Sequence, residues 1–296
     1  MKKFENLKDK AFPYLMCLPA LLLFFVFILC PFFTGLYTSF QKWDGYGEMS
    51  WVGLQNYGFV LTDDVFWQAM QNTLVYAILV TVAKNVIALG LAMLLMRKIP
   101  LRTIFRTGIY MPVTMSYVVI GILWVWIYNP TFGLLNQVLS GLGLDSWIVG
   151  WLSDPNYALF SVVWVDIWKW MGYHTVLYLA GLQGISKDLY EAASMDGANG
   201  WQKLWSITIP QLNSTIVVNV LMSITGAFVS NYDIVSIMTG GGPFHKTEVS
   251  LTYIMTTAFK YSNMGKASAM SMILFLIVLV FGFLQLRTMT KEENYD

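Results

Sequence analysis

The stretch Ser186-Lys-Asp-Leu-Tyr-Glu-Ala-Ala-Ser-Met-Asp-Gly-Ala-Asn-Gly-Trp201, which continues to Ile-Thr-Ile-Pro210, decides how this chain is organised. Ser186 suits the N-cap of a short helix, and Asp188 suits the positive first turn of that helix. Asp196-Gly197 supplies a turn, because glycine adopts a positive φ without strain. A second short helix then carries Trp201 toward the next apolar segment. The stretch is predicted to be a small helix–turn–helix at a membrane surface.

Two neighbouring alanines, Ala192 and Ala193, leave one face of the first short helix shallow. Another protein could approach such a face closely. The alternative is an amphipathic connector that joins two membrane spans and binds nothing. The residues of the stretch alone leave both interpretations open.

The composition around this stretch is that of an integral membrane protein. Of the 296 residues, 56% are hydrophobic and only 12% are charged, whereas roughly 25% of residues are charged in an average soluble domain. The mean hydropathy of +0.57 agrees. A net charge of +1 gives no reason to expect a nucleic-acid partner. Lipid is therefore the expected solvent for most of the chain.

Six apolar stretches are expected to cross the membrane, because a helix of ~20 apolar residues spans the hydrocarbon core. The fifth is placed from residue 208, so that Pro210 falls in its first turn, where proline is tolerated. We expect one all-α transmembrane domain over residues 1–296, with the helix–turn–helix loop at 183–207. The predicted spans are 14–38, 73–96, 108–128, 158–182, 208–231 and 267–286.

The first span is expected to be an uncleaved helix rather than a signal peptide. Its apolar run continues through Pro31 and is longer than the 7–15 residues of a signal peptide's apolar region. Cys17 and Cys30 both lie in this run. Thirteen residues of helix would separate them by about 20 Å, which is too far for a disulfide.

Lysine and arginine in the short loops predict the orientation. Twelve of them fall in the two tails and in the second and fourth loops, against four in the other loops. Positive residues concentrate on the cytoplasmic side of membrane proteins. Both termini are therefore expected in the cytoplasm, in a multi-pass protein of a cell (plasma or inner) membrane.

The sequence lacks the patterns that support catalysis. It has no glycine-rich phosphate loop ending in Gly-Lys-Ser/Thr and no Gly-x-Ser-x-Gly nucleophile motif. The two histidines, His174 and His245, fall in a span and in an external loop, so they do not suggest a metal site. We expect a transport subunit that is not an enzyme and binds no metal or cofactor.

The helix–turn–helix stretch resembles the signature loop of ATP-binding-cassette (ABC) importer permeases. Its spacing is E-A-A, three residues, G, nine residues, I-x-L-P, and Ile209 replaces the usual leucine. The fuller form E-A-A-x-x-D-G-A is similar to the carbohydrate-uptake branch, the maltose, glycerol-phosphate and multiple-sugar permeases. The residues in register are Glu191, Ala192, Ala193, Asp196, Gly197, Ala198, Ile207 and Pro210.

Further matches to this family extend along most of the chain. They are Pro19, Val52-Gly53-Leu54-Gln55-Asn56-Tyr57, Asn72-Thr73, Thr239-Gly240-Gly241-Gly242-Pro243, Thr247 and Ala267-Ser268-Ala269.

The resemblance implies a complete importer around this chain. A second, related permease subunit would complete the pathway, and two cytoplasmic ATPase subunits would bind ATP and magnesium. An extracytoplasmic binding protein would deliver the solute, and its contact would include the loop Gly240–Pro243. The coupling residues implied by the resemblance, which would sit in a cleft of the ATPase, are Glu191, Ala192, Ala193, Asp196 and Gly197.

Polar residues on one helical face of the fourth span are candidates for solute contact. Asp166, Lys169, Trp170 and Tyr173 are spaced i, i+3, i+4 and i+7, which places them on one face. Carboxylate and ammonium groups bind sugar hydroxyls, and aromatic rings stack on sugar faces. The alternative is an Asp166–Lys169 pair that holds helices together, with the aromatic rings as packing.

The fifth span adds Ser223 and Ser230 as candidate solute contacts. The resemblance places Ser223 at a serine of maltose-type permeases, whereas Ala227 replaces a polar contact there. In the second span, Lys84 has no evident role, and a pore-facing or subunit-interface position is expected for it because a lysine in lipid is costly.

Two other functions compete with the importer. A self-sufficient secondary transporter would couple to protons through Asp166, and we would expect repeats with broken helices in both halves. A structural or respiratory subunit would need cofactor ligands. The signature loop argues against both.

Overall fold

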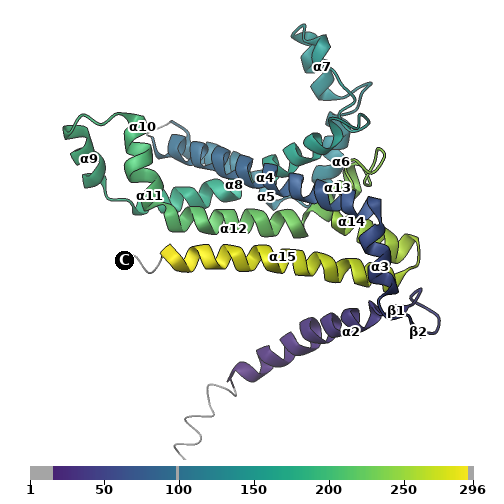
Figure 1. The fold of residues 1–296 in the computed structure, drawn as a ribbon. Coiled ribbons are helices and arrows are strands. Elements are labelled where there is room, and N and C mark those ends of the chain that lie inside the picture. Colours follow the sequence, from purple (N-terminus) through teal and green to yellow (C-terminus); the bar gives the residue numbers. More distant parts are fainter. Residues whose placement is uncertain (1–15, 98–99, 293–296) are drawn as a thin grey trace, which may run out of the picture. The chain divides into compact units, whose positions relative to one another are not determined.

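The computed structural model describes residues 16–97 and 100–292, and the chain divides into two compact units (Figure 1). Unit 1 comprises Met1–Asp63 with Ile254–Asp296, and unit 2 comprises Asp64–Tyr253. Lys2, Lys3, Lys8, Lys10 and Lys98, which contribute to the predicted orientation, lie outside the described residues.

Unit 1 joins the beginning and end of the described chain. A helix at Met16–Thr38 precedes a short antiparallel ribbon in which Gln41 pairs with Trp51. The Asn56 side-chain amide donates to the carbonyl oxygens of Ser39 (2.9 Å) and Gln41 (2.8 Å) and so fixes the ribbon. Cys17 and Cys30 are both free and exposed. The elements are η1 (Phe25–Leu29), α2 (Cys30–Thr38), β1 (Gln41–Lys42), β2 (Ser50–Trp51), α3 (Gln55–Thr62), η4 (Thr256–Lys260) and α15 (Met264–Glu292).

Unit 2 is built on two long helices, α4 (Asp64–Met96) and α8 (Ala158–Gly184). Ala88 and Ala92 of α4 belong to a buried cluster with Tyr178 of α8. Small residues let helices approach closely, which matters in lipid because the hydrophobic effect does not drive helices together there. The other elements are α5 (Arg102–Thr114), α6 (Tyr117–Ile127), α7 (Leu134–Gly141), η2 (Asp145–Trp147), α9 (Lys187–Met195), α10 (Gly200–Lys203), η3 (Leu204–Thr208), α11 (Ile209–Gln211), α12 (Asn213–Val229), α13 (Asn231–Met238) and, across the boundary of the units, α14 (Ser250–Met255).

The helices depart from the predicted spans chiefly at two bends. Among the described residues, Met16–Thr38 and Asp64–Met96 are each long and apolar enough to cross a membrane. The predicted stretch 108–128 is divided between α5 and α6, which are bent by 103°, and the stretch 208–231 is divided near Leu212 with a bend of 74°. The number of membrane spans stays a prediction.

The first of these bends follows from local sequence. Pro112 lies inside α5 and removes a backbone donor, and Met115 is extended with ψ 146°. Ser116 then caps α6 by accepting a hydrogen bond from the Val119 N–H. One helix therefore ends and another begins within the predicted third span.

Candidate functional site

A buried ion pair joins the two long helices of unit 2. Lys84 Nζ of α4 lies 2.6 Å from Asp166 Oδ2 of α8, and both side chains are only 4% exposed. The other carboxylate oxygen of Asp166 accepts from the Tyr117 hydroxyl at 3.1 Å, and Trp170 Nε1 donates to the Tyr117 oxygen at 2.6 Å. Asp166 is therefore paired with Lys84 and not with Lys169, the partner that the alternative interpretation of the sequence gave it.

Lys169 instead binds the end of a broken helix. Its ammonium donates to the carbonyl oxygens of Met115 (2.6 Å), Pro112 (3.3 Å) and Val113 (3.3 Å). These carbonyls lie where α5 ends, and only that of Pro112 also accepts a backbone N–H, from Met115 at 3.2 Å. Backbone groups at membrane depth need such partners. Lys169 thus uses its three N–H donors to stabilise the α5–α6 bend.

A pocket of about 360 Å³ lies beside the ion pair. The rings of Trp170 and Tyr173 line it at 89° to one another, with centroids 5.8 Å apart. Of the predicted solute contacts, Trp170, Tyr173 and Ser230 belong to its lining, and Asp166, Lys169 and Ser223 do not. The lining residues are Lys84, Tyr117, Trp170, Tyr173, His174, Met222, Thr225, Gly226 and Ser230.

Ser223 lies in a polar network among α4, α8 and α12 rather than in the pocket lining. Its hydroxyl donates to the Asn219 carbonyl (2.8 Å) and accepts from the Asn85 side-chain amide (3.2 Å). His174 Nδ1 lies 2.8 Å from Asn219 Oδ1, and the Tyr178 hydroxyl donates to Asn85 Oδ1 at 2.6 Å. Because these groups satisfy one another, the network fixes the position of the His174 ring in the lining.

Several lining residues were not among the sequence candidates. Lys84 stood out in the sequence as a lysine in an apolar span, but its partner could not be identified. Tyr117 gave no signal, since only the bend before α6 brings it to Asp166. Met222, Thr225 and Gly226 are ordinary residues of an apolar helix.

The helix–turn–helix forms as predicted. The Ser186 hydroxyl accepts from the Asp188 N–H at 3.2 Å and caps α9, and Gly197 has φ 77°. Asn199 and Gln202 form a reciprocal capping box at the start of α10. The predicted local structure is therefore confirmed, whereas the coupling role stays a prediction.

Two side-chain hydrogen bonds tie α9 to the segment that follows it. The Tyr190 hydroxyl lies 2.9 Å from Thr208 Oγ1, and Lys203 Nζ donates to Ser194 Oγ at 2.7 Å. No residue of α9 is buried, and Met195 is 89% exposed. Figure 1 shows α9 beyond the ends of α8 and α12. Its faces, with Glu191, remain open to a partner.

The glycine-rich loop is held at its base and open at its tip. Gly240 and Gly241 have φ 61° and 89°, and a Cβ on Gly241 would collide with the Glu248 carboxylate. The Asn72 side-chain amide of α4 donates to the carbonyls of His245 (3.0 Å) and Glu248 (2.8 Å). Phe244 is 83% exposed at the tip. The loop therefore presents a fixed surface.

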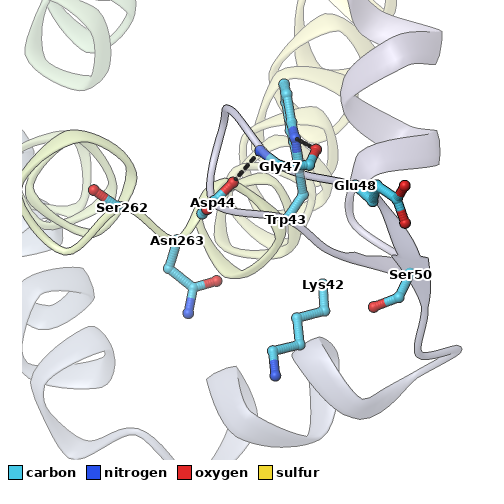
Figure 2. Close-up of a pocket in the computed structure, with 8 residues that line it drawn as sticks. All are labelled: Lys42, Trp43, Asp44, Gly47, Glu48, Ser50, Ser262 and Asn263. Atoms are coloured by element: carbon cyan, nitrogen blue, oxygen red, sulfur yellow. Dashed lines mark hydrogen bonds between the residues drawn. The ribbon is translucent and has the colours of Figure 1, made fainter.

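Unit 1 contains a second pocket of about 340 Å³, beside the two-stranded ribbon (Figure 2). The N–H groups of Gly47 (2.8 Å) and Tyr46 (2.9 Å) donate to Asp44 and hold the pKa of its carboxyl below the ordinary value. The Asp44 side chain therefore stabilises the turn in which it lies. Nowhere in residues 16–97 and 100–292 do three or more His, Cys, Asp or Glu side chains gather as a metal site. The pocket is lined by Lys42, Trp43, Asp44, Gly47, Glu48, Ser50, Ser262 and Asn263.

Comparison with known proteins relates this arrangement to transport. The chain is 32% identical to the probable starch degradation products transport system permease protein AmyD of Thermoanaerobacterium thermosulfurigenes, over 99% of this chain and 98% of AmyD. It is 33% identical to the sn-glycerol-3-phosphate transport system permease protein UgpA of Agrobacterium fabrum, over 97% of each chain.

The fold is shared with a solved importer. A chain of the bacterial alginate ABC transporter, crystallised in complex with an alginate pentasaccharide-bound periplasmic protein, aligns with a TM-score of 0.82 and 25% identity over 96% of each chain. Residues 84–288 match the model of the binding-protein-dependent transport system inner membrane component. The chain therefore belongs to this family and is an ABC importer permease.

Proposed function

We propose that this chain is a permease subunit of an ATP-driven, binding-protein-dependent importer whose solute is a carbohydrate. It would form half of the translocation pathway, together with a second, related permease subunit. Two ATPase subunits would bind ATP and magnesium in the cytoplasm and drive alternating access. The relative named for starch degradation products, and the alginate importer, support carbohydrate as the solute class.

The observation that carries the solute assignment is the pocket of unit 2. Trp170 and Tyr173 offer ring faces at right angles, which suit the apolar faces of a sugar ring. The hydroxyls of Thr225 and Ser230 and the ammonium of Lys84 also line it, so that hydrogen-bonding groups surround the aromatic pair.

The arrangement of unit 2 supports the proposed partners. Figure 1 shows α9 and α10 at one end of the unit and α7 toward the other. We assign the end with Glu191 and Gly197 to the cytoplasmic ATPase. The loop Gly240–Pro243 and its exposed Phe244 are assigned to the extracytoplasmic binding protein. Both termini would then lie in the cytoplasm of a prokaryote.

The experiment that tests this proposal begins with affinity purification of the tagged chain from its native membrane. We expect an ATPase and a second permease to be recovered with it, and we expect Glu191→Arg to lose the ATPase while keeping the permease. Glu48→Arg, on the ribbon of unit 1, is the matched control and should keep both. Proteoliposomes that contain the complex, supplied with its binding protein, should take up sugar only when ATP is present.

Two results would contradict the proposal. Uptake driven by a proton gradient without ATP would favour the alternative hypothesis of a secondary transporter. If Glu191→Arg and the native chain recover equal amounts of the ATPase, then α9 does not make the proposed contact with the ATPase.

A further inference from the structure

The pocket lining carries information on solute charge, which the names of the relatives leave open. One relative is named for starch degradation products, and another for sn-glycerol-3-phosphate, whose phosphate is anionic. Resting on the proposed function, we propose that this pocket accepts uncharged sugars and rejects anionic ones, and that Asp166 maintains this preference by neutralising the Lys84 ammonium.

Lys84 is the one cationic side chain among the residues that line the pocket in the described part of the chain. Its ammonium is already neutralised by Asp166 at 2.6 Å. A carboxylate or phosphate entering the pocket would have to compete with Asp166 for Lys84. It would also stand near the negative charge of Asp166, where little water screens the repulsion. The pair therefore disfavours an anion.

Lys169 does not supply a second charge for an anionic solute. Its ammonium donates to three carbonyl oxygens at the end of α5, at Met115, Pro112 and Val113. These bonds use all three of its N–H donors, and Lys169 is only 3% exposed. Turning it toward a solute would remove the donor that the Met115 and Val113 carbonyls have at the end of a broken helix.

The remaining lining suits an uncharged ring with hydroxyl groups. Trp170 and Tyr173 give two perpendicular aromatic faces, and Thr225 and Ser230 contribute hydroxyls that donate or accept. The His174 ring is oriented from behind by Asn219. A volume of about 360 Å³ accommodates a sugar unit. The polar groups of this lining can therefore bind sugar hydroxyls and do not require a charged group on the solute.

The ion pair makes the preference reversible by substitution. Asp166→Asn keeps the shape of the side chain but leaves the Lys84 ammonium uncompensated, so the pocket should then admit an anionic sugar. The double variant Lys84→Gln/Asp166→Asn removes both charges and should keep the native preference. The contrast between the single and double variants isolates the free ammonium as the cause.

The experiment measures ligand binding to the complete importer complex in lipid nanodiscs, without its binding protein, whose own specificity would interfere. The probes are methyl glucoside and methyl glucuronide, with the methyl galactoside and galacturonide pair in parallel. Each pair differs only in a carboxylate at C6. Saturation-transfer NMR reports binding of either member directly. Trp170→Ala identifies the signal that comes from this pocket.

For the native complex we expect at least a five-fold larger signal from a neutral probe than from its acidic partner. Trp170→Ala should abolish that signal. Asp166→Asn should raise the acidic probe to the level of the neutral one or above, whereas the double variant should not. Asp145→Asn removes an exposed carboxylate outside the pocket lining and is the matched control, which should behave as the native complex does.

The proposal is overturned if the native pocket binds acidic and neutral probes equally, if it binds neither, or if the double variant admits the acidic probe. Should Asp166→Asn fail to assemble, Lys84→Gln decides, because it leaves the Asp166 carboxylate uncompensated and should lower the acidic signal below that of the double variant. Equal acidic signals from these two variants would overturn the proposal. Failure of the proposed function would appear elsewhere, as sugar uptake that does not require ATP.

Discussion

The two candidate functional regions of unit 2, the pocket beside Asp166 and helix α9, are stabilised in opposite ways. Around Asp166, charged and polar side chains from separate helices are buried and satisfy one another. At α9 no residue is buried, and local caps with two side-chain hydrogen bonds hold the helix. A pocket that selects a solute needs a fixed lining. A helix that docks on another protein keeps its faces uncovered, so the partner completes its packing.

The largest effect is expected from breaking the buried ion pair on one side. Asp166→Asn leaves the Lys84 ammonium without a counter-charge in a buried site. Breaking such a pair costs about 3–5 kcal/mol. We expect a marked loss of thermal stability in detergent, measured by the unfolding of the purified chain, with a smaller loss in the nanodisc.

A double substitution sharpens this prediction. Lys84→Met/Asp166→Leu removes both charges together and should recover most of the stability, since apolar residues often replace a buried pair without loss. Equal stability of Asp166→Asn and the native chain would show that the buried pair contributes little. The buried contacts around Asp166 would then contribute no more to stability than the exposed contacts of α9 do.

An intermediate effect is expected at the turn after α9. Gly197 has φ 77°, and a Cβ built on it meets no atom within 4 Å. Gly197→Ala therefore adds backbone strain alone, about 1–2 kcal/mol, without a collision. We expect normal assembly of the purified complex but fewer solute molecules transported per ATP hydrolysed. Asn199→Gly, which should cost only a few tenths of a kcal/mol at this cap, is the control. An unchanged transport ratio in Gly197→Ala would contradict a coupling role for the turn.

The region of α9 could be predicted from sequence because its structure is local. Ser186, Asp188 and Gly197 act on backbone groups within three residues of themselves. Their capping and turn chemistry is visible in a short window of sequence, whatever the rest of the chain does. The same window carries the family resemblance, so local structure and family membership followed together.

The pocket region could be predicted only in part, because its contacts are distant in sequence. Helical periodicity placed Asp166, Trp170 and Tyr173 on one face, but it could not show that Asp166 meets Lys84, eighty-two residues earlier. Lys169, the nearer candidate, instead donates to backbone carbonyls at the end of α5. These carbonyls are available because the third apolar stretch bends after Pro112. A bend inside an apolar run leaves little trace in hydropathy, so that rearrangement required the structure.

Several residues that match the family along the chain make side-chain hydrogen bonds that stabilise the local structure. Asn56 ties the ribbon of unit 1, Asn72 holds the glycine-rich loop, and the Thr239 hydroxyl contacts Thr247 at 2.7 Å. Each of these side chains makes a hydrogen bond that stabilises the ribbon or the loop. The sequence could identify these positions as matches to the family, but it could not identify their hydrogen-bond partners.

The smallest effect is expected from removing a single hydroxyl at the tie between α9 and η3. The Thr208 hydroxyl donates to the Lys203 carbonyl at 3.3 Å, so Tyr190 donates to Thr208 at 2.9 Å. Tyr190→Phe deletes this bond alone, a net loss of about 0.5–1.5 kcal/mol. Because Thr208 lies just before α11, we expect α9 to move less tightly with α12, and transport per ATP to fall about two-fold.

A matched control separates loss of the tie from loss of a tyrosine hydroxyl in general. Tyr110 is 37% exposed on α5, and Tyr110→Phe should leave the transport ratio unchanged. Thr208→Val removes the same tie from the other side together with the Thr208–Lys203 bond, so the double variant Tyr190→Phe/Thr208→Val should be no worse than Thr208→Val alone. Additive losses would mean that the two hydroxyls act separately, and α9 would then drive α12 through the Asp196-Gly197 turn and α10 alone.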